Sequence, residues 1–108
     1  YHTAFIALTS QELESFNYKK GDTEGIVNYA LSIAEINFSA IFIERDDEIK
    51  ISFRSKGNFD VNSFARNHFE GGGHHNAAGG KGAEKMDETI MKFIQLLPQY
   101  KQALSLHE

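Results

Sequence analysis

The chain has no cysteine, only one proline and no long hydrophobic run. Without cysteine there can be no disulfide framework, no thiolate zinc site and no cysteine nucleophile, which suits a reducing compartment. No stretch approaches the roughly eighteen consecutive apolar residues that a membrane-spanning helix requires. We therefore expect a cytoplasmic protein with no membrane partner.

What is present is an ordinary globular composition. The chain has 108 residues, of which 41% are apolar and 24% are charged, with nine Phe and four Tyr. A chain of this length forms one domain and buries roughly two thirds of the surface that its unfolded form exposes. Its first residue is Tyr1 and not Met. We therefore expect the single domain 1–108 to be a fragment of a longer protein.

The charge is unevenly distributed. A net charge of −4 argues against a protein that wraps long nucleic acid, because such binding requires a broad basic face. Residues 50–81 nevertheless carry five basic and two acidic side chains, whereas the remainder carries six basic and thirteen acidic ones. A confined basic region on an acidic body suits a small anion or the end of a nucleic-acid chain.

Hydrophobic periodicity predicts strands and helices along the whole chain. Strands are expected at residues 3–8, 37–44 and 48–55, and helices at residues 9–16, 22–34, 60–69 and 86–97, with a kink at Pro98 and a further turn or two at residues 100–106. The order β-α-α-β-β-α-(β)-α predicts an α/β domain, with a mixed sheet of about four to five strands and helices packed on it.

Helix starts near the N-terminus are indicated by capping signals. Thr9 and Glu12 have the spacing of a capping box. After a polar loop at residues 17–21, Asp22 or Thr23 can cap the second helix.

Six of the nine Gly fall between residues 71 and 82, where Gly71-Gly72-Gly73 precedes His74. Three consecutive Gly cost backbone entropy, about 0.5 to 1 kcal/mol each relative to Ala in regular structure, so they are expected where positive φ or close approach is required. Exposed amides in such a loop can form a concave nest for an anion, to which His74 can add a donor. The alternative is a flexible loop or a tight connector. The spacing matches neither a P-loop nor the GxGxxG dinucleotide motif.

The segment Arg54-Ser55-Lys56 is the second candidate site. Polar and apolar residues alternate along the strand 48–55, which predicts that Arg54 stands on a solvent-exposed face. Its planar guanidinium can grip a phosphate through two oxygens. The alternative is a solvated basic end of a hairpin. Because the helix 60–69 could return the chain to the end of this strand, we expect Arg54 and the glycine segment to lie together.

The histidines do not predict a metal site. Adjacent His74 and His75 cannot easily direct both rings at one ion, and no His-Glu-x-x-His spacing occurs. His68 continues the apolar face of its helix and is expected to be packed there. The sequence has no nucleophile elbow and no convincing carboxylate pair, so it indicates a binding module.

Taken together, three stretches resemble the C-terminal, DHH-associated domain of the DHH-family phosphoesterases: Ser52-Phe-Arg-Ser-Lys-Gly57, the helix from Asp60 to Phe69, and Gly71-Gly-Gly-His-His-Asn-Ala-Ala-Gly79. Asp22-Thr-Glu-Gly-Ile-Val-Asn28 is similar to the branch containing bacterial oligoribonuclease/pAp-phosphatase and exopolyphosphatase-like proteins. In that family a separate N-terminal domain carries Asp and His ligands for two manganese ions, which activate water against a phosphoester. The pair His74-His75 is not that family's Asp-His-His motif, because Gly73 precedes it.

The resemblance implies a two-domain parent whose catalytic domain is absent here, and a non-catalytic fragment without metal or cofactor that presents a nucleotide or short single-stranded RNA to that domain. Its substrate contacts map onto Arg54, Ser55, Lys56, Gly71, Gly72, Gly73, His74, Asn76, Ala77, Ala78 and Gly79. His75 occupies a position that varies in such proteins. A homodimer of the parent protein is left open.

The sequence leaves two alternatives open. The glycine segment is shared with cyclic-dinucleotide phosphodiesterases and single-strand exonucleases, although the acidic balance of the chain favours short substrates. An alternative of another class is a non-catalytic interaction domain, in which the glycine segment is a connector and the last helix docks a partner protein.

Overall fold

The computed structural model describes residues 2–15, 20–33, 35–45, 48–82 and 85–105. Its elements are β1 (Thr3–Leu8), α1 (Ser10–Ser15), α2 (Lys20–Ser32), β2 (Phe38–Arg45), β3 (Glu48–Ser55), α3 (Val61–His68), β4 (Gly72–His74), β5 (Ala77–Gly82), α4 (Met86–Leu96), the 3-10 helix η1 (Leu97–Tyr100) and α5 (Lys101–Ser105). In these residues we find no helix that combines the length and the apolar character needed to cross a bilayer.

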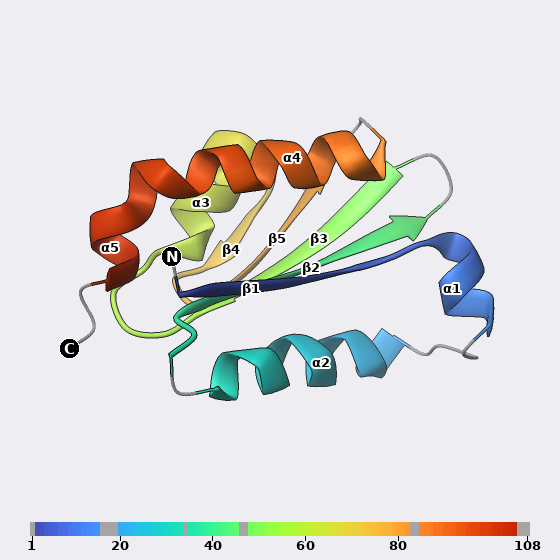
Figure 1. The fold of residues 1–108 in the computed structure, drawn as a ribbon, viewed down its shortest axis with the longest axis horizontal. Helices are drawn as coiled ribbons and strands as arrows, with labels where there is room; N and C mark the ends of the chain where they lie inside the picture. The colour runs from blue at the N-terminus through green and yellow to red at the C-terminus, as the bar shows by residue number, and fades with distance from the viewer. Residues whose placement is uncertain (1, 16–19, 34, 46–47, 83–84, 106–108) are drawn as a thin grey trace.

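The five strands form one mixed sheet in the order β1-β2-β3-β5-β4 (Figure 1). β1 runs parallel to β2, and the other neighbouring pairs are antiparallel. This arrangement confirms the predicted α/β class and the predicted element order. The predicted order left one strand open after the helix 60–69. The structure has two strands in this glycine-rich segment, β4 and β5, which form a hairpin.

Helices cover both faces of the sheet, with α3 and α4 on one side and α1 and α2 on the other (Figure 1). The side of α3 and α4 holds an aromatic core in which the ring of Phe93 lies 5.2 Å from that of Phe42 and 5.5 Å from that of Phe38. A smaller aliphatic core on the other side contains Leu13 and Val27. β2 is buried on both faces, as its continuous apolar run predicts.

The predicted capping box before α1 is present. The Thr9 amide donates to Glu12 Oε1 at 2.8 Å, and the Glu12 amide donates to Thr9 Oγ1 at 3.2 Å. The predicted start of the second helix at Asp22 or Thr23 is wrong, since α2 begins at Lys20. Residues 20 and 21 are therefore helical rather than part of a loop, while residues 16–19 lie outside the described part of the chain.

The C-terminal helix changes at the predicted kink. Pro98 lies within η1, and α5 continues from Lys101. The side-chain amide of Asn37 donates to the carbonyl of Leu104 at 2.8 Å, which ties α5 to the start of β2.

His68 is half-buried and packed, as expected, with its Nε2 2.6 Å from the Tyr100 hydroxyl. Burial, followed by the nearby charge of Lys92, lowers the pKa of His68.

Candidate phosphate-binding surface

The sheet register assembles polar side chains from three strands on one face. Arg54 of β3 is paired with Ala77 of β5, and Ala77 is paired with His74 of β4. Residues directly opposite each other in antiparallel strands point to the same face. We call this surface the open face and define it by Lys50, Ser52 and Arg54 of β3, Ala77, Gly79 and Lys81 of β5, and His74 of β4.

The open face lies on the α2 side of the sheet, beside that helix. Contacts of α2 are made with β1, β2 and β3. A shallow groove lies over the neighbouring part of this face, between β3, β5 and the segment that leads into β4. Its charged lining residues are Lys50 and Lys81, together with Glu48 and Glu70 at its margin. The two predicted site regions are therefore adjacent, and the prediction that they lie together is confirmed.

Arg54 is less exposed than the alternation predicts. Its side chain is 15% exposed, and its guanidinium forms an ion pair with Glu24 of α2 and donates to the carbonyl of Phe53 at 2.9 Å. The expectation of a solvent-exposed position for Arg54 is wrong because α2 packs over this end of β3. The contact holds the guanidinium against α2, and Arg54 itself does not line the groove.

Gly71, just before β4, and Gly73 within β4 are required by close packing in the hairpin itself. A Cβ atom at Gly71 would lie 1.9 Å from the carbonyl oxygen of Gly79, and one at Gly73 would lie 2.8 Å from that of Ala77. Gly79 differs, because a Cβ there would have only the Ile51 carbonyl oxygen within 4 Å, at 3.5 Å. Gly79 therefore leaves open space above the sheet, whereas Gly71 and Gly73 allow the backbone segments of the hairpin to approach each other closely.

The predicted anion nest of backbone amides is not present at Gly71 and Gly73. The Gly71 amide donates to the carbonyl of Ala65 at 3.2 Å, and the Gly73 amide donates to Asn62 Oδ1 at 2.9 Å. The segment forms a hairpin rather than a loop, and α3 binds its outer edge through Asn62. The basic and polar side chains of the open face, rather than these amides, are available to an anion.

Two of the predicted contacts are used to hold the turn between β4 and β5. Ser55 is buried, and its hydroxyl donates to the carbonyl of Phe59 at 2.6 Å. The Asn76 amide nitrogen donates to that hydroxyl at 2.9 Å. The structure therefore gives Ser55 and Asn76 a positioning role, and it does not bring the Ser55 hydroxyl to the open face.

The other flanking residues of this turn are also engaged. Lys56 Nζ donates to the carbonyl of Ile33 at 3.0 Å, just beyond the end of α2. Nε2 of His75 lies 3.1 Å from the carbonyl oxygen of Gly57. Ala78 points into the aromatic core.

Asp60 is the N-cap of α3. Its carboxylate accepts a hydrogen bond from the Ser63 amide, which is the main cause that lowers the pKa of Asp60.

Lys50, Ser52 and Lys81 of the open face, and Glu24 of α2 beside it, were not predicted as site residues from the sequence. The contact of Glu24 with Arg54 follows from the packing of α2 against the sheet. Glu24 lies in the Asp22–Asn28 stretch that carries the resemblance, but nothing in that stretch indicated this contact. Lys50 and Lys81 are brought together by the pairing of β3 with β5. The alternation of polar and apolar residues in β3 could have indicated that Lys50 faces solvent beside Arg54. No periodic pattern in the glycine-rich segment indicated that β5 pairs with β3 and places Lys81 opposite Lys50.

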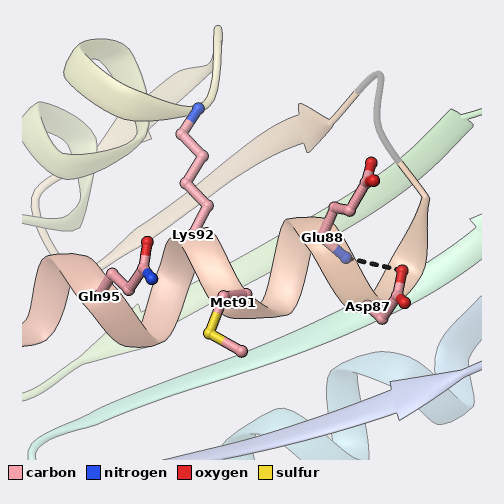
Figure 2. Close-up of a pocket in the computed structure, with 5 residues that line it drawn as sticks. All are labelled: Asp87, Glu88, Met91, Lys92 and Gln95. Atoms are coloured by element: carbon pink, nitrogen blue, oxygen red, sulfur yellow. Dashed lines mark hydrogen bonds between the residues drawn. The ribbon is translucent and has the colours of Figure 1, made fainter.

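A second hollow lies on the outer side of α4 (Figure 2) and is lined by Asp87, Glu88, Met91, Lys92 and Gln95. Lys92 extends toward α3, where its ammonium lies 4.7 Å from the ring centre of Phe69, while Met91 points the other way. Asp87 Oδ1 accepts a hydrogen bond from the amide of Glu88. Its two carboxylates outnumber its one lysine, and its side chains do not converge on one point. The open face, which carries Lys50, Arg54 and Lys81, is therefore the stronger candidate for an anion. Within the described ranges, no group of three or more His, Asp or Glu is arranged to hold a metal ion.

Almost the whole chain matches one known protein family. Residues 2–103 match the DHHA1 domain family. This chain belongs to that family. The DHHA1 domain is an accessory domain of DHH-family phosphoesterases, in which it accompanies an N-terminal DHH catalytic domain.

Known relatives of this DHHA1 domain are longer than it is. It is 34% identical over 76 residues to the bifunctional oligoribonuclease and PAP phosphatase NrnA of Bacillus subtilis, covering 70% of this chain and 24% of that protein. The structure of an exopolyphosphatase-related protein from Bacteroides fragilis matches with 46% identity and a TM-score of 0.89, over 95% of this chain and 30% of the other. The pGpG-specific phosphodiesterase PggH of Vibrio cholerae shares the fold, with 16% identity and a TM-score of 0.52 over 68% of this chain and 26% of that one. The domain thus spans about a quarter of the curated relative.

Proposed function

We propose that this DHHA1 domain binds the terminal phosphate of a nucleotide or short single-stranded oligonucleotide and presents it to a DHH catalytic domain of the same protein. The observation that carries the proposal is the register Arg54–Ala77–His74, which sets a guanidinium and an imidazole on one face of the sheet. Two strand spacings separate Arg54 from His74, about 10 Å at the backbone. Both side chains are long enough to reach one phosphate between them.

The chemistry of the two side chains suits a phosphate. A guanidinium offers paired N–H donors that match two phosphate oxygens, and an imidazole adds a further donor. Ala77 lies between them and is small, so a ligand can approach the sheet closely. Gly79, next along the same face of β5, leaves the adjoining floor open.

In this proposal the cleavage chemistry belongs to the partner domain. Two manganese ions held there would activate water, while the DHHA1 domain contributes affinity and orientation. The relative from Bacillus subtilis, named as an oligoribonuclease and PAP phosphatase, supports short RNA or pAp as the substrate class. The parent protein is accordingly proposed to be a cytoplasmic phosphoesterase.

The test uses Arg54→Ala and His74→Ala in the full-length protein, with Lys85→Ala, an exposed residue outside the open face, as the control. Loss of a charge-assisted hydrogen bond costs about 1.5 to 3 kcal/mol, so we expect Arg54→Ala to raise KM for a short oligoribonucleotide about tenfold or more. His74→Ala should act in the same direction and less strongly. If both variants bind and cleave the oligonucleotide like the parent, the assignment is wrong.

A cyclic-dinucleotide phosphodiesterase or a single-strand exonuclease is the alternative within nucleotide chemistry. The short reach of the open face favours short substrates, and a length series of RNA and DNA oligomers separates the two cases. A processive nuclease should continue to gain affinity as strands lengthen, whereas this surface should reach a plateau after a few nucleotides.

An interaction domain is the alternative from another class. It is favoured by two apolar side chains on the outer side of α4, Met91 and Ile94, which are 53% and 41% exposed. In that case a nucleotide would leave the amide NMR signals of the β4–β5 hairpin unaffected.

A further inference from the structure

Two lysines stand opposite each other on the open face. Lys50 of β3 is paired in register with Lys81 of β5, and both are exposed. They lie on the same face as Arg54, because Lys50 and Arg54 are separated by four residues of one strand. Both lysines line the shallow groove, together with Ser52 and Gly79.

This pairing is unfavourable for the unliganded sheet. Like charges directly opposite each other across two strands repel and destabilise the pair. Among the described residues, neither ammonium group has a carboxylate within salt-bridge distance. An anion placed between the two lysines would remove the repulsion and gain two charge-assisted contacts.

We infer that Lys50 and Lys81 form a second phosphate subsite, so that one oligonucleotide is held by Arg54 and His74 at its terminal phosphate and by the lysine pair at a later one. This inference rests on the proposed function and specifies its substrate as an oligonucleotide with at least two phosphates. The spacing from Arg54 to Lys50 along β3 is about 13 Å at the backbone. Between the two subsites, Gly79 provides a floor without a side chain.

Acidic side chains limit the extent of this surface. Glu48 lies two residues before Lys50 on the same face of β3, at the end away from Arg54. Glu48 and Glu70 both line the groove. The row along β3 therefore changes from positive to negative beyond the lysine pair. A phosphate chain that extended past Lys50 would meet a carboxylate, which confines the binding surface to a short oligonucleotide.

The test measures the affinity of the full-length protein for adenosine monophosphate and for a 5′-phosphorylated oligoadenylate of five nucleotides, with EDTA present to prevent metal-dependent cleavage. The variants are Lys50→Gln/Lys81→Gln and Arg54→Ala, with Lys85→Gln/Lys101→Gln as a control of equal net charge whose residues lie outside the open face. We expect the Lys50/Lys81 variant to bind the pentanucleotide about three- to tenfold more weakly and the mononucleotide within about twofold of the parent. The slope of its salt dependence should fall by about 0.7, since the variant no longer neutralises one phosphate of the single strand.

The outcomes separate this inference from the proposed function. Unchanged pentanucleotide affinity and salt dependence in the Lys50/Lys81 variant would overturn the second subsite, as would an equal loss for both ligands. Arg54→Ala should weaken both ligands, and if it weakened neither, the proposed function would fail at its own site. A loss confined to the pentanucleotide in the lysine variant, with the control unchanged, supports the subsite.

Discussion

At the scale of single residues, Arg54 is shared between the protein and its proposed ligand. The guanidinium already contacts Glu24 and the carbonyl of Phe53, while the Glu24 side chain remains 58% exposed. A carboxylate at this position both orients the guanidinium and competes with an incoming phosphate. Because Glu24 is largely solvated, the orienting ion pair contributes little stability, and the competition for an anion should dominate.

This competition predicts the effect of Glu24→Gln. The amide keeps the shape of the side chain and removes its negative charge, so we expect short oligonucleotides to bind about two- to fivefold more tightly. The measurement is equilibrium binding at two salt concentrations, with Glu14→Gln on the exposed surface of α1 as the control. Weaker binding in the Glu24 variant would show that orientation of Arg54 outweighs repulsion.

The residues found from the sequence were those with a local signal. Thr9 and Glu12 were found because a capping box depends on a spacing of three residues. Arg54 and His74 were found through their motifs, but the partners of Arg54 were not. Glu24 is thirty residues away in the chain, and no local pattern reports a contact at that separation.

At the scale of elements, the β4–β5 hairpin contains glycines with two different roles. Gly71 lies against the backbone of β5, where a side chain would collide, whereas Gly79 faces the open groove. The sequence shows only that glycine is concentrated here. It could not show the hairpin, because a run of Gly and Ala has no hydrophobic alternation to mark its strands.

The two roles are separable by substitution. Gly71→Ala places a methyl group 1.9 Å from the Gly79 oxygen, so we expect a clearly lower Tm. Gly79→Ala should leave the Tm within a few degrees of the parent and weaken oligonucleotide binding, since its methyl group occupies the floor of the groove. Thermal unfolding and binding are measured on both variants. Full affinity in a folded Gly79 variant would argue against ligand contact at this floor.

The helix α2 shows how tertiary packing overrides local preference. It begins at Lys20 and includes Gly21 and Gly25, although glycine is unfavourable in a helix interior. Burial of Val27 against β2 supplies the stabilisation that local propensity lacks. The same packing covers the end of β3, which explains the unexpected burial of Arg54.

At the scale of the whole molecule, the net charge of −4 and the basic window are consistent with one another. The sheet concentrates Lys50, Arg54, His74 and Lys81 on one face, while acidic residues are more numerous in the rest of the chain. Such a distribution attracts a short anion to one place and disfavours a long polyanion along the body. The predicted fold class and element order were correct because most elements have clear hydrophobic periods.

In the proposed function, Arg54 and the β4–β5 hairpin bind one anionic ligand. The most direct measurement is the amide NMR spectrum of the chain during titration with adenosine monophosphate. We predict shifts at Arg54, at Gly72 to His74 and at Ala77 to Gly79, with none at Met91 to Gln95 on the outer side of α4. Saturable binding that shifts the α4 signals and leaves the hairpin unchanged would contradict the claim.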